Sequence, residues 1–193
     1  MSRAELAITI VTLALAVAYM LLFAEHCQAQ TETERRNALW LARAGVSEVG
    51  WARTKASKDE QSAVWHVLKR RWRRMARIPG IGRLELSDMV RLYCAGLGNK
   101  QWTPRQRWVR NLSWERGKPD GWPKNADWKV HEPLWHDTLK RAMSFLQGKS
   151  RNPCAYAEHF GSRKAGDYPR GRMRLHQCSV RFENQFYTIA KEE

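Results

Sequence analysis

The chain has 193 residues, of which 43% are hydrophobic and 10% aromatic, which excludes a compositionally disordered protein and allows one ordinary domain behind a short leader. The formal net charge of +15 indicates a polyanionic partner, such as nucleic acid, an anionic envelope polymer or a phospholipid surface. Ten tryptophans are unusual in so short a chain, and exposed tryptophan rings often serve as flat stacking surfaces.

Residues 6–24 form an apolar segment without a charged side chain. At about 1.5 Å per residue, a helix of this length nearly spans a hydrocarbon core of about 30 Å. We therefore expect residues 1–29 to be a membrane anchor or an export signal that contacts the membrane through residues 6–24. Small residues at Cys27 and Ala29 would suit cleavage after Ala29, whereas the length of the apolar stretch favours an uncleaved anchor.

Residues 30–193 are expected to form one domain, which opens with a helix. Residues 31–34 form a capping box, and the apolar positions that follow have helical spacing up to Gly45 and Gly50. Glu48 therefore lies at a helix terminus. A carboxyl that is partly desolvated there would have a raised pKa and could act as an acid near neutral pH. A solvated glutamate at a helix end is the ordinary alternative.

A second capping box, at residues 57–60, opens a helix that Pro79 and Gly80 stop. The far end of this helix, residues 69–74, is strongly basic, and such a run is usually a solvated helix face. A short helix is expected over residues 87–95.

Another helix is expected to start at residues 103–104, where proline occupies a favoured first helical position. Residues 113–132 are rich in Trp, Gly and Pro and indicate a long surface loop. Pro133 is then expected to start an amphipathic helix that Gly148 ends. The tail from residue 151 has loop character and finishes in a strand over residues 185–189, so the domain is expected to be mostly helical.

Cys154 and Cys178 flank a stretch rich in glycine and arginine that lacks a core pattern of its own. A disulfide between them would stabilise this loop by roughly 3 kcal/mol on the chain-entropy model. Such a bond would indicate an oxidising compartment. Two independent buried thiols are the alternative.

The sequence gives no support for a cofactor or a metal site. It contains no glycine-rich phosphate loop between a strand and a helix. The four cysteines lack the paired short spacing of a zinc site. No local signature indicates a Ser-His-Asp or Cys-His site, although such a site stays open.

Four segments, taken in order, resemble the cell-wall hydrolase family that includes the spore-cortex-lytic enzymes. Residues 42–51 and 59–70 are similar to its opening, an alanine-rich helix that ends in a catalytic glutamate, followed by a helix patterned like GQxAVAxVxxNR. Residues 152–161 look like the family's ATHY/W segment, and residues 184–187 look like its closing HxFY pattern. The likeness covers both ends of residues 38–190, while the middle matches only in general helicity.

By this resemblance the fold is lysozyme-like, mainly α with a small irregular or β C-terminal part, behind one N-terminal transmembrane helix. The implied activity is cleavage of the glycan strand of peptidoglycan, with Glu48 as the general acid that protonates the glycosidic oxygen. In lytic transglycosylases one carboxyl can serve as acid and then as base while the substrate's own hydroxyl attacks. The usual pairing of two carboxylates is then not required.

The resemblance also implies that His159 and Tyr187 contact the substrate, with Asn184 in the same closing motif. Glu60 and Glu158 are the candidates for a second carboxyl, and Glu60 is counted among the substrate-binding residues. Each of these residues also has an ordinary structural reading, as a hydrogen-bonding or core side chain.

Two other functions stay open. The apolar leader, basic charge and small size also suit a non-enzymatic, membrane-inserted phage particle protein whose basic domain contacts DNA or neighbouring subunits. An envelope-associated binding module is the third possibility. The enzyme itself would act from a membrane anchor outside the cytoplasm, or packaged in a phage particle, during host lysis or genome delivery.

Overall fold

The computed structural model describes residues 15, 17, 19, 20, 31–80, 84–94, 107–154, 157–162, 173–175, 178 and 184–189. Most of the membrane segment expected at residues 6–24 lies outside this set, as does the helix start expected at residues 103–104. Among the described residues, no helix has both the length and the apolar character needed to cross a membrane. The chain divides into two compact units, residues 1–36 and 37–193, and the candidate site belongs to the second.

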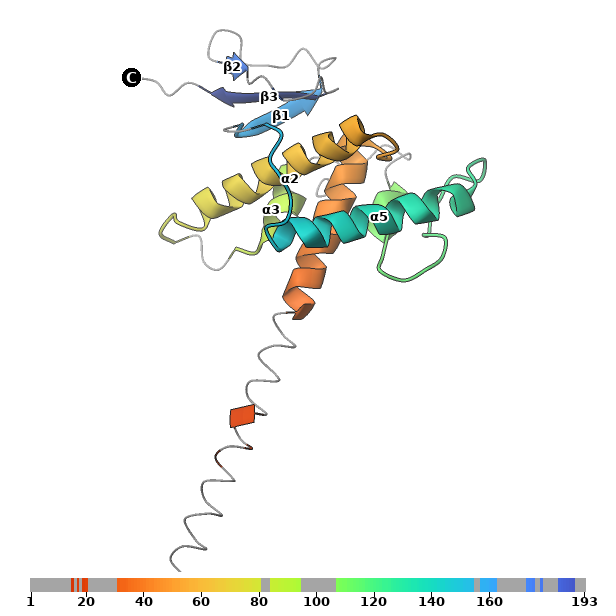
Figure 1. The fold of residues 1–193 in the computed structure, drawn as a ribbon, viewed down its shortest axis with the longest axis horizontal. Helices are drawn as coiled ribbons and strands as arrows, with labels where there is room; N and C mark the ends of the chain where they lie inside the picture. The colour runs from red at the N-terminus through yellow and green to blue at the C-terminus, as the bar shows by residue number, and fades with distance from the viewer. Residues whose placement is uncertain are drawn as a thin grey trace, which may run out of the picture. The chain divides into compact units, whose positions relative to one another are not determined.

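The second unit is mainly helical, as the sequence predicts, and a small sheet follows the helices (Figure 1). Residues 31–49 are helical. The further elements are α2 (Lys55–Met75), α3 (Leu86–Tyr93), the short 3₁₀ helix η1 (Arg107–Asn111), α5 (Trp128–Leu146), β1 (His159–Ser162), β2 (Met173–Leu175) and β3 (Asn184–Ile189).

The helix over residues 31–49 packs closely against α2. A side chain at Gly45 would place its Cβ atom 3.2 Å from both Gln61 and Trp65, so the glycine permits the close approach of the two helices. Trp65 donates from Nε1 to the carbonyl oxygen of Leu41 at 2.7 Å across this contact. Gly50 ends the helix at a φ of +87°, a conformation that glycine adopts without steric cost. These contacts fix the helix end that carries the candidate acid.

Helix α2 begins earlier than the sequence predicts. Its N-cap is Thr54, and Ser57, expected as the cap, is the third residue of the helix. The two side chains form a reciprocal capping box: Ser57 N donates to Thr54 Oγ1 at 3.2 Å, and Thr54 N donates to Ser57 Oγ at 3.0 Å. A serine can thus fill the role that the capping-box pattern reserves for Glu or Gln.

Helix α5 also begins earlier than predicted, and Pro133 lies inside it rather than at its start. Asp127 is the N-cap and accepts a hydrogen bond from Lys129 N at 2.9 Å. A strong side-chain cap outweighs the single backbone bond that proline removes near a helix start. The expected end at Gly148 is confirmed, since Gly148 N donates to Phe145 O at 3.0 Å in the first turn beyond the helix.

The C-terminal residues form a three-stranded antiparallel sheet in the order β1-β3-β2. The strand expected over residues 185–189 is confirmed as β3, which begins one residue earlier at Asn184. The sequence missed β1 and β2, because strands of four and three residues are too short to show an alternating pattern. In the register, His159 of β1 stands opposite Tyr187 of β3.

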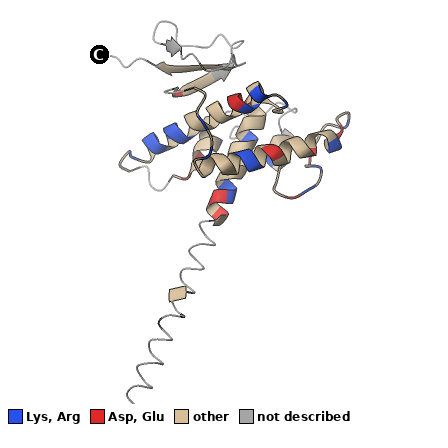
Figure 2. Ribbon diagram, viewed as in Figure 1, with Lys and Arg blue, Asp and Glu red and all other residues tan. Residues whose placement is uncertain are grey.

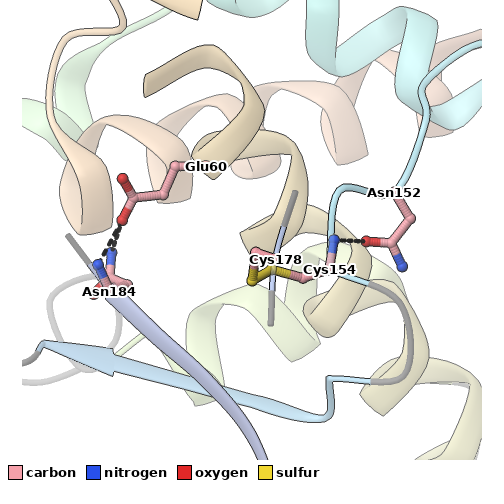
Figure 3. The surroundings of a disulfide bond; sticks show 5 residues. All are labelled: Glu60, Asn152, Cys154, Cys178 and Asn184. Atoms are coloured by element: carbon pink, nitrogen blue, oxygen red, sulfur yellow. Dashed lines mark hydrogen bonds between the residues drawn. A yellow bond between two sulfur atoms is a disulfide. The ribbon is translucent and has the colours of Figure 1, made fainter. Parts of the chain in front are cut away.

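A disulfide joins Cys154 to Cys178, the pairing expected from the sequence (Figure 3). The two Cα atoms lie 4.5 Å apart. Cys154 is buried, and Cys178 packs against the same hydrophobic core as the helices. The bond therefore ties the segment before the third strand to the segment that follows α5.

Candidate active site

Glu48 lies one residue before the end of its helix, as expected, and its side chain is half-buried. Burial raises the pKa of this carboxyl above its usual range, and a hydrogen bond with the thiol of Cys94 opposes that rise in part. Cys94 directly follows α3 and is itself buried. Burial, and then the neighbouring Glu48 carboxyl, raise the pKa of the Cys94 thiol, so it stays protonated and donates.

Glu60 and Asn184 meet beside this helix end (Figure 3). Asn184 donates to Oε1 of Glu60 twice, from its backbone N at 2.7 Å and from Nδ2 at 2.9 Å. The same Nδ2 lies 3.2 Å from the backbone carbonyl oxygen of Glu48. Both side chains are buried, with 3% of Glu60 and 6% of Asn184 exposed, so they position the helix end rather than offer an open surface.

His159 and Tyr187 face each other across the sheet. Their rings are stacked, with centroids 5.2 Å apart and an angle of 14° between the planes. Tyr93, the last residue of α3, brings its hydroxyl to 3.4 Å from Nδ1 of His159. Because Tyr93 precedes Cys94 in the chain, the end of α3 connects this aromatic pair to the Glu48 carboxyl. Glu48 and His159 thus each contact the end of α3, whereas Glu60 and Asn184 contact each other beside the backbone of Glu48.

Arg71 of α2 fixes the protonation of His159. Its Nη1 lies 2.7 Å from Nδ1 of the imidazole, and a guanidinium can only donate, so Nδ1 is the acceptor. Burial and the adjacent Arg71 charge lower the pKa of His159 below its usual value. The imidazole is therefore neutral near pH 7 and carries its proton on Nε2.

Glu158, the other candidate for a second carboxyl, is engaged by an arginine. Arg74 donates from Nη1 to Oε2 at 3.0 Å and from Nη2 to Oε1 at 2.6 Å, a bidentate pair near the surface. Its backbone N donates to the carbonyl oxygen of Tyr187 at 3.1 Å, which continues the pairing of β1 with β3. Glu158 thus lies close to the aromatic pair and faces Arg74.

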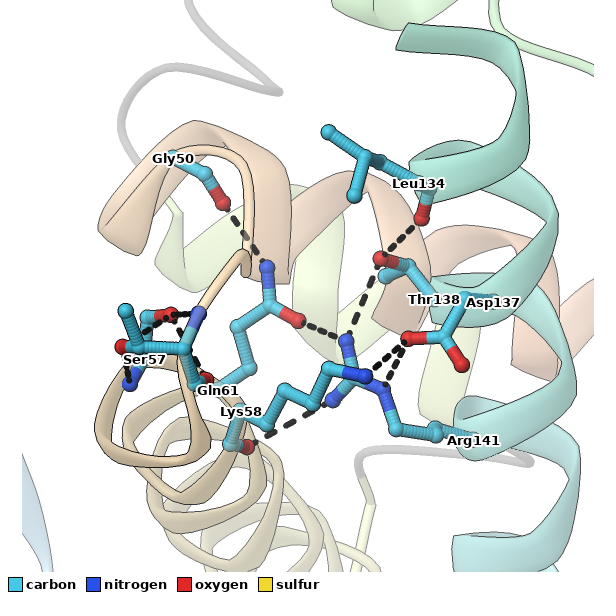
Figure 4. A network of polar contacts seen from close by, with 9 residues as sticks. Gly50, Ser57, Lys58, Gln61, Leu134, Asp137, Thr138 and Arg141 are labelled. Atoms are coloured by element: carbon cyan, nitrogen blue, oxygen red, sulfur yellow. Dashed lines mark hydrogen bonds and ion pairs between the residues drawn. The ribbon is translucent and has the colours of Figure 1, made fainter.

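A buried polar network holds the segment that follows Glu48 (Figure 4). Gln61, which is fully buried, donates from Nε2 to the carbonyl oxygen of Gly50 at 2.8 Å. Its Oε1 accepts from Nη2 of Arg141 at 2.6 Å, and Arg141 also bonds Asp137 at 3.0 Å. Helices α2 and α5 therefore fix the backbone two residues beyond Glu48 through one glutamine.

The sequence reasoning missed Arg71, Tyr93 and Cys94. Arg71 belongs to the basic run over residues 69–74, which the sequence suggests is a solvated face. Only part of that run is solvated, because Lys69 lies over the ring of Phe145, 5.1 Å from its centroid, and Arg71 is half-buried. No pattern in the sequence marks Tyr93 or Cys94, since only the folded chain brings the end of α3 to Glu48.

Two hollows among the described residues lie on other parts of the surface. One, of about 450 Å³, is lined by Arg116, Glu132, Pro133, His136, Asp137 and Lys140. The other, of about 270 Å³, is lined by residues of α2 and α5 and by residues 149–151. Within the described part of the chain, no group of three or more His, Cys, Asp or Glu side chains is arranged to hold a metal ion.

Comparisons of the chain with protein-family models, with curated proteins and with solved structures found no match. The likeness to the cell-wall hydrolases therefore stays a prediction from short motifs.

Proposed function

We propose that the chain is a lysozyme-like enzyme that cleaves the glycan strand of peptidoglycan, with Glu48 as its general acid. The observation that carries the proposal is the burial of the Glu48 carboxyl, which raises its pKa at the helix end where the resemblance expects an acid. A carboxyl with a raised pKa keeps its proton closer to neutral pH and can deliver it to a leaving group.

The proposed reaction needs one carboxyl. Glu48 gives its proton to the glycosidic oxygen as the bond from that oxygen to the anomeric carbon breaks. A hydroxyl of the same sugar attacks the anomeric carbon, and the resulting carboxylate takes the hydroxyl proton, which restores the acid. This lytic transglycosylase route suits a site in which Glu60 is held by Asn184 and Glu158 by Arg74. The muramidase route, in which water attacks, is the second form of the proposal.

The neighbours of Glu48 are proposed to position it and to contact the sugar chain. The Cys94 thiol donates to the carboxyl, which favours one orientation of the acid. His159 and Tyr187 contribute stacked rings, and aromatic faces suit the apolar faces of sugars. Asn184 and Glu60 position the end of the helix that carries Glu48 through their hydrogen bonds.

The test is wall cleavage by the full chain and by Glu48→Gln, with purified peptidoglycan as substrate. Loss of turbidity and release of muropeptides are followed, and the mass of the released sugar ends separates the transglycosylase product from the hydrolysed one. General acid help is worth about 10²–10⁴-fold, so Glu48→Gln should lose about that much activity while keeping its fold.

The matched control is Glu158→Gln, a glutamate near the aromatic pair, which should retain most of the wild-type activity. Equal activity of the wild type and a folded Glu48→Gln protein would remove Glu48 from the mechanism. A wild-type protein without wall-cleaving activity would contradict the proposal that the chain is an enzyme.

A second candidate is a non-enzymatic phage particle protein that is inserted in a membrane and contacts DNA or other subunits. In Figure 2 the ribbon of the C-terminal part of α2 carries several Lys and Arg positions, and Arg73 in this helix and Arg77 just after it are exposed. Binding by such charges is insensitive to sequence and weakens steeply as salt rises. DNA retention that falls between low and moderate salt, in a protein without wall-cleaving activity, would favour this candidate.

We further propose that the domain works outside the cytoplasm, from a membrane anchor or inside a phage particle. The disulfide between Cys154 and Cys178 supports an oxidising location, because cytosolic thiols are usually kept reduced. Fractionation of host cells, with non-reducing mapping of the two cysteines, tests this location.

A further inference from the structure

Arg71 is a half-buried cation whose partners are all neutral. It donates to Nδ1 of His159 at 2.7 Å, and its guanidinium carbon lies 3.9 Å from the centroid of the Tyr93 ring. Among the described residues, no carboxylate forms an ion pair with it. Glu158, which directly precedes β1, is bound by Arg74, three residues further along α2.

A guanidinium that is partly removed from water is stabilised by an anion more than by neutral partners. Arg71 has five N–H donors and uses one of them on His159. The imidazole carries its own proton on Nε2, because its Nδ1 already accepts from Arg71. The Tyr93 hydroxyl lies 3.4 Å from the same Nδ1, too long for a strong bond, so its proton is available to another acceptor. Donors from α2 and α3 therefore meet beside Nδ1 of the β1 imidazole.

We propose that Arg71, Tyr93 and His159 form a subsite for a carboxylate of the peptide branch that the glycan strand carries. This inference rests on the proposed function, since it names the part of the substrate that the site recognises beside the scissile bond. Arg71 provides the planar fork that binds carboxylates through two parallel hydrogen bonds. The ring of Tyr93 lies against the guanidinium, and the ring of Tyr187 is stacked on His159. This apolar ring surface suits an amino-acid residue better than a strongly hydrated phosphate.

The chain order also places this subsite beside the acid. Tyr93 contacts Arg71 with its ring, and the next residue, Cys94, donates to the carboxyl of Glu48. A strand whose glycosidic oxygen reached Glu48 would have its branch beside the end of α3. Arg71 would then favour binding of strands that carry a peptide with a free carboxylate.

The test measures binding, so that it does not depend on turnover. The full chain with Glu48→Gln, which leaves the ligand uncut, is titrated with muropeptides whose peptide carboxylates are intact and with the same muropeptides converted to methylamides. Adding Arg71→Gln should weaken binding of the intact form by about 10- to 100-fold, the range for a hydrogen bond to a charged group, and should leave binding of the methylamide form unchanged.

The matched control is Arg73→Gln, which removes the same charge from an exposed position two residues away. Equal weakening by Arg71→Gln and Arg73→Gln would replace the subsite with a diffuse charge effect. If Arg71→Gln weakens binding of the intact and methylamide ligands equally, Arg71 does not recognise the peptide carboxylate. If Arg71→Gln does not fold, Arg71→Lys carries the test, because it keeps the charge but loses the fork and should bind the intact ligand several-fold more weakly.

The two proposals fail separately. A wild-type protein that binds intact muropeptides through Arg71 but does not cleave peptidoglycan would support the proposed subsite and contradict the proposed enzymatic activity. A wild-type protein that cleaves intact and methylamide strands equally well would support the proposed enzymatic activity and contradict the proposed subsite.

Discussion

Asn184 donates twice to the same oxygen of Glu60, with its backbone N at 2.7 Å and its side-chain Nδ2 at 2.9 Å. The two residues are 124 positions apart, so this contact joins the first residue of β3 to the N-terminal part of α2. The Nδ2 atom also lies 3.2 Å from the carbonyl oxygen of Glu48. One asparagine thus ties the small sheet to the helix end that carries the proposed acid.

Replacement of Asn184 should therefore destabilise the domain. In Asn184→Ala, the buried Glu60 carboxylate keeps the backbone donor but loses the amide donor, which should lower the free energy of unfolding by about 1–3 kcal/mol. Asn184→Asp should cost more, because it places a second carboxylate against the first. Urea denaturation of both variants and the wild type measures the difference. An unchanged unfolding midpoint in Asn184→Ala would show that the amide contributes nothing to the fold.

The raised pKa of Glu48 predicts a pH dependence of stability. Because the folded pKa lies above the ordinary value of 4.5, the folded state holds a proton between these two values that the unfolded state has lost. The free energy of unfolding should therefore fall as the pH rises through this window. Glu48→Gln removes the titration, so its stability relative to the wild type should increase as the pH is raised from 4 towards 7.

Thermal unfolding of the wild type and Glu48→Gln at several pH values measures this difference. Glu115→Gln, which changes an exposed glutamate, is the control and should follow the wild type throughout. A constant gap between Glu48→Gln and the wild type would mean that the Glu48 pKa is the same in the folded and unfolded states.

Much of the helical framework could be predicted from the sequence, because apolar spacing and capping residues are local signals. The ends at Gly50 and Gly148 follow from glycine's ability to adopt a positive φ. The predicted starts of α2 and α5 were wrong because several residues in each stretch could begin the helix. Thr54 competes with Ser57, and Asp127 competes with the preference of Pro133 for a first turn.

The candidate site could be predicted only in part. The position of Glu48 at a helix end is local, and β3 has enough residues to show its strand pattern. The partners Arg71 and Cys94 come from segments distant in sequence, and nothing local distinguishes Arg71 from the exposed Arg73 two residues later. Their roles depend on which face of α2 meets the sheet and on where α3 ends, which are properties of the packed chain.

Loss of the disulfide should weaken the C-terminal part of the domain. Cys154→Ser should lower the free energy of unfolding by about 2–5 kcal/mol, the range for a native disulfide in a small exported domain. Denaturation with and without a reductant measures the effect. The reductant should lower the stability of the wild type towards that of Cys154→Ser and should not change the variant further. A wild type that is insensitive to complete reduction would show that the bond does not stabilise the fold.

The last prediction concerns Gln61, which links the backbone after Glu48 to α5 (Figure 4). Gln61→Met has a similar volume but leaves the carbonyl of Gly50 and one donor of Arg141 without this partner. Because both groups are at least partly buried, the free energy of unfolding should fall by about 1–3 kcal/mol.

Lys58→Met is the matched control in the same network. It removes an ion pair with Asp137 whose side chains are 40% and 41% exposed, and such pairs contribute less than about 1 kcal/mol. If the proposed enzyme is active, Gln61→Met should also lower its kcat, since Gln61 fixes the backbone two residues beyond the acid, whereas Lys58→Met should not. A Gln61→Met protein that is less stable but has an unchanged kcat would mean that the network stabilises the helices without positioning Glu48.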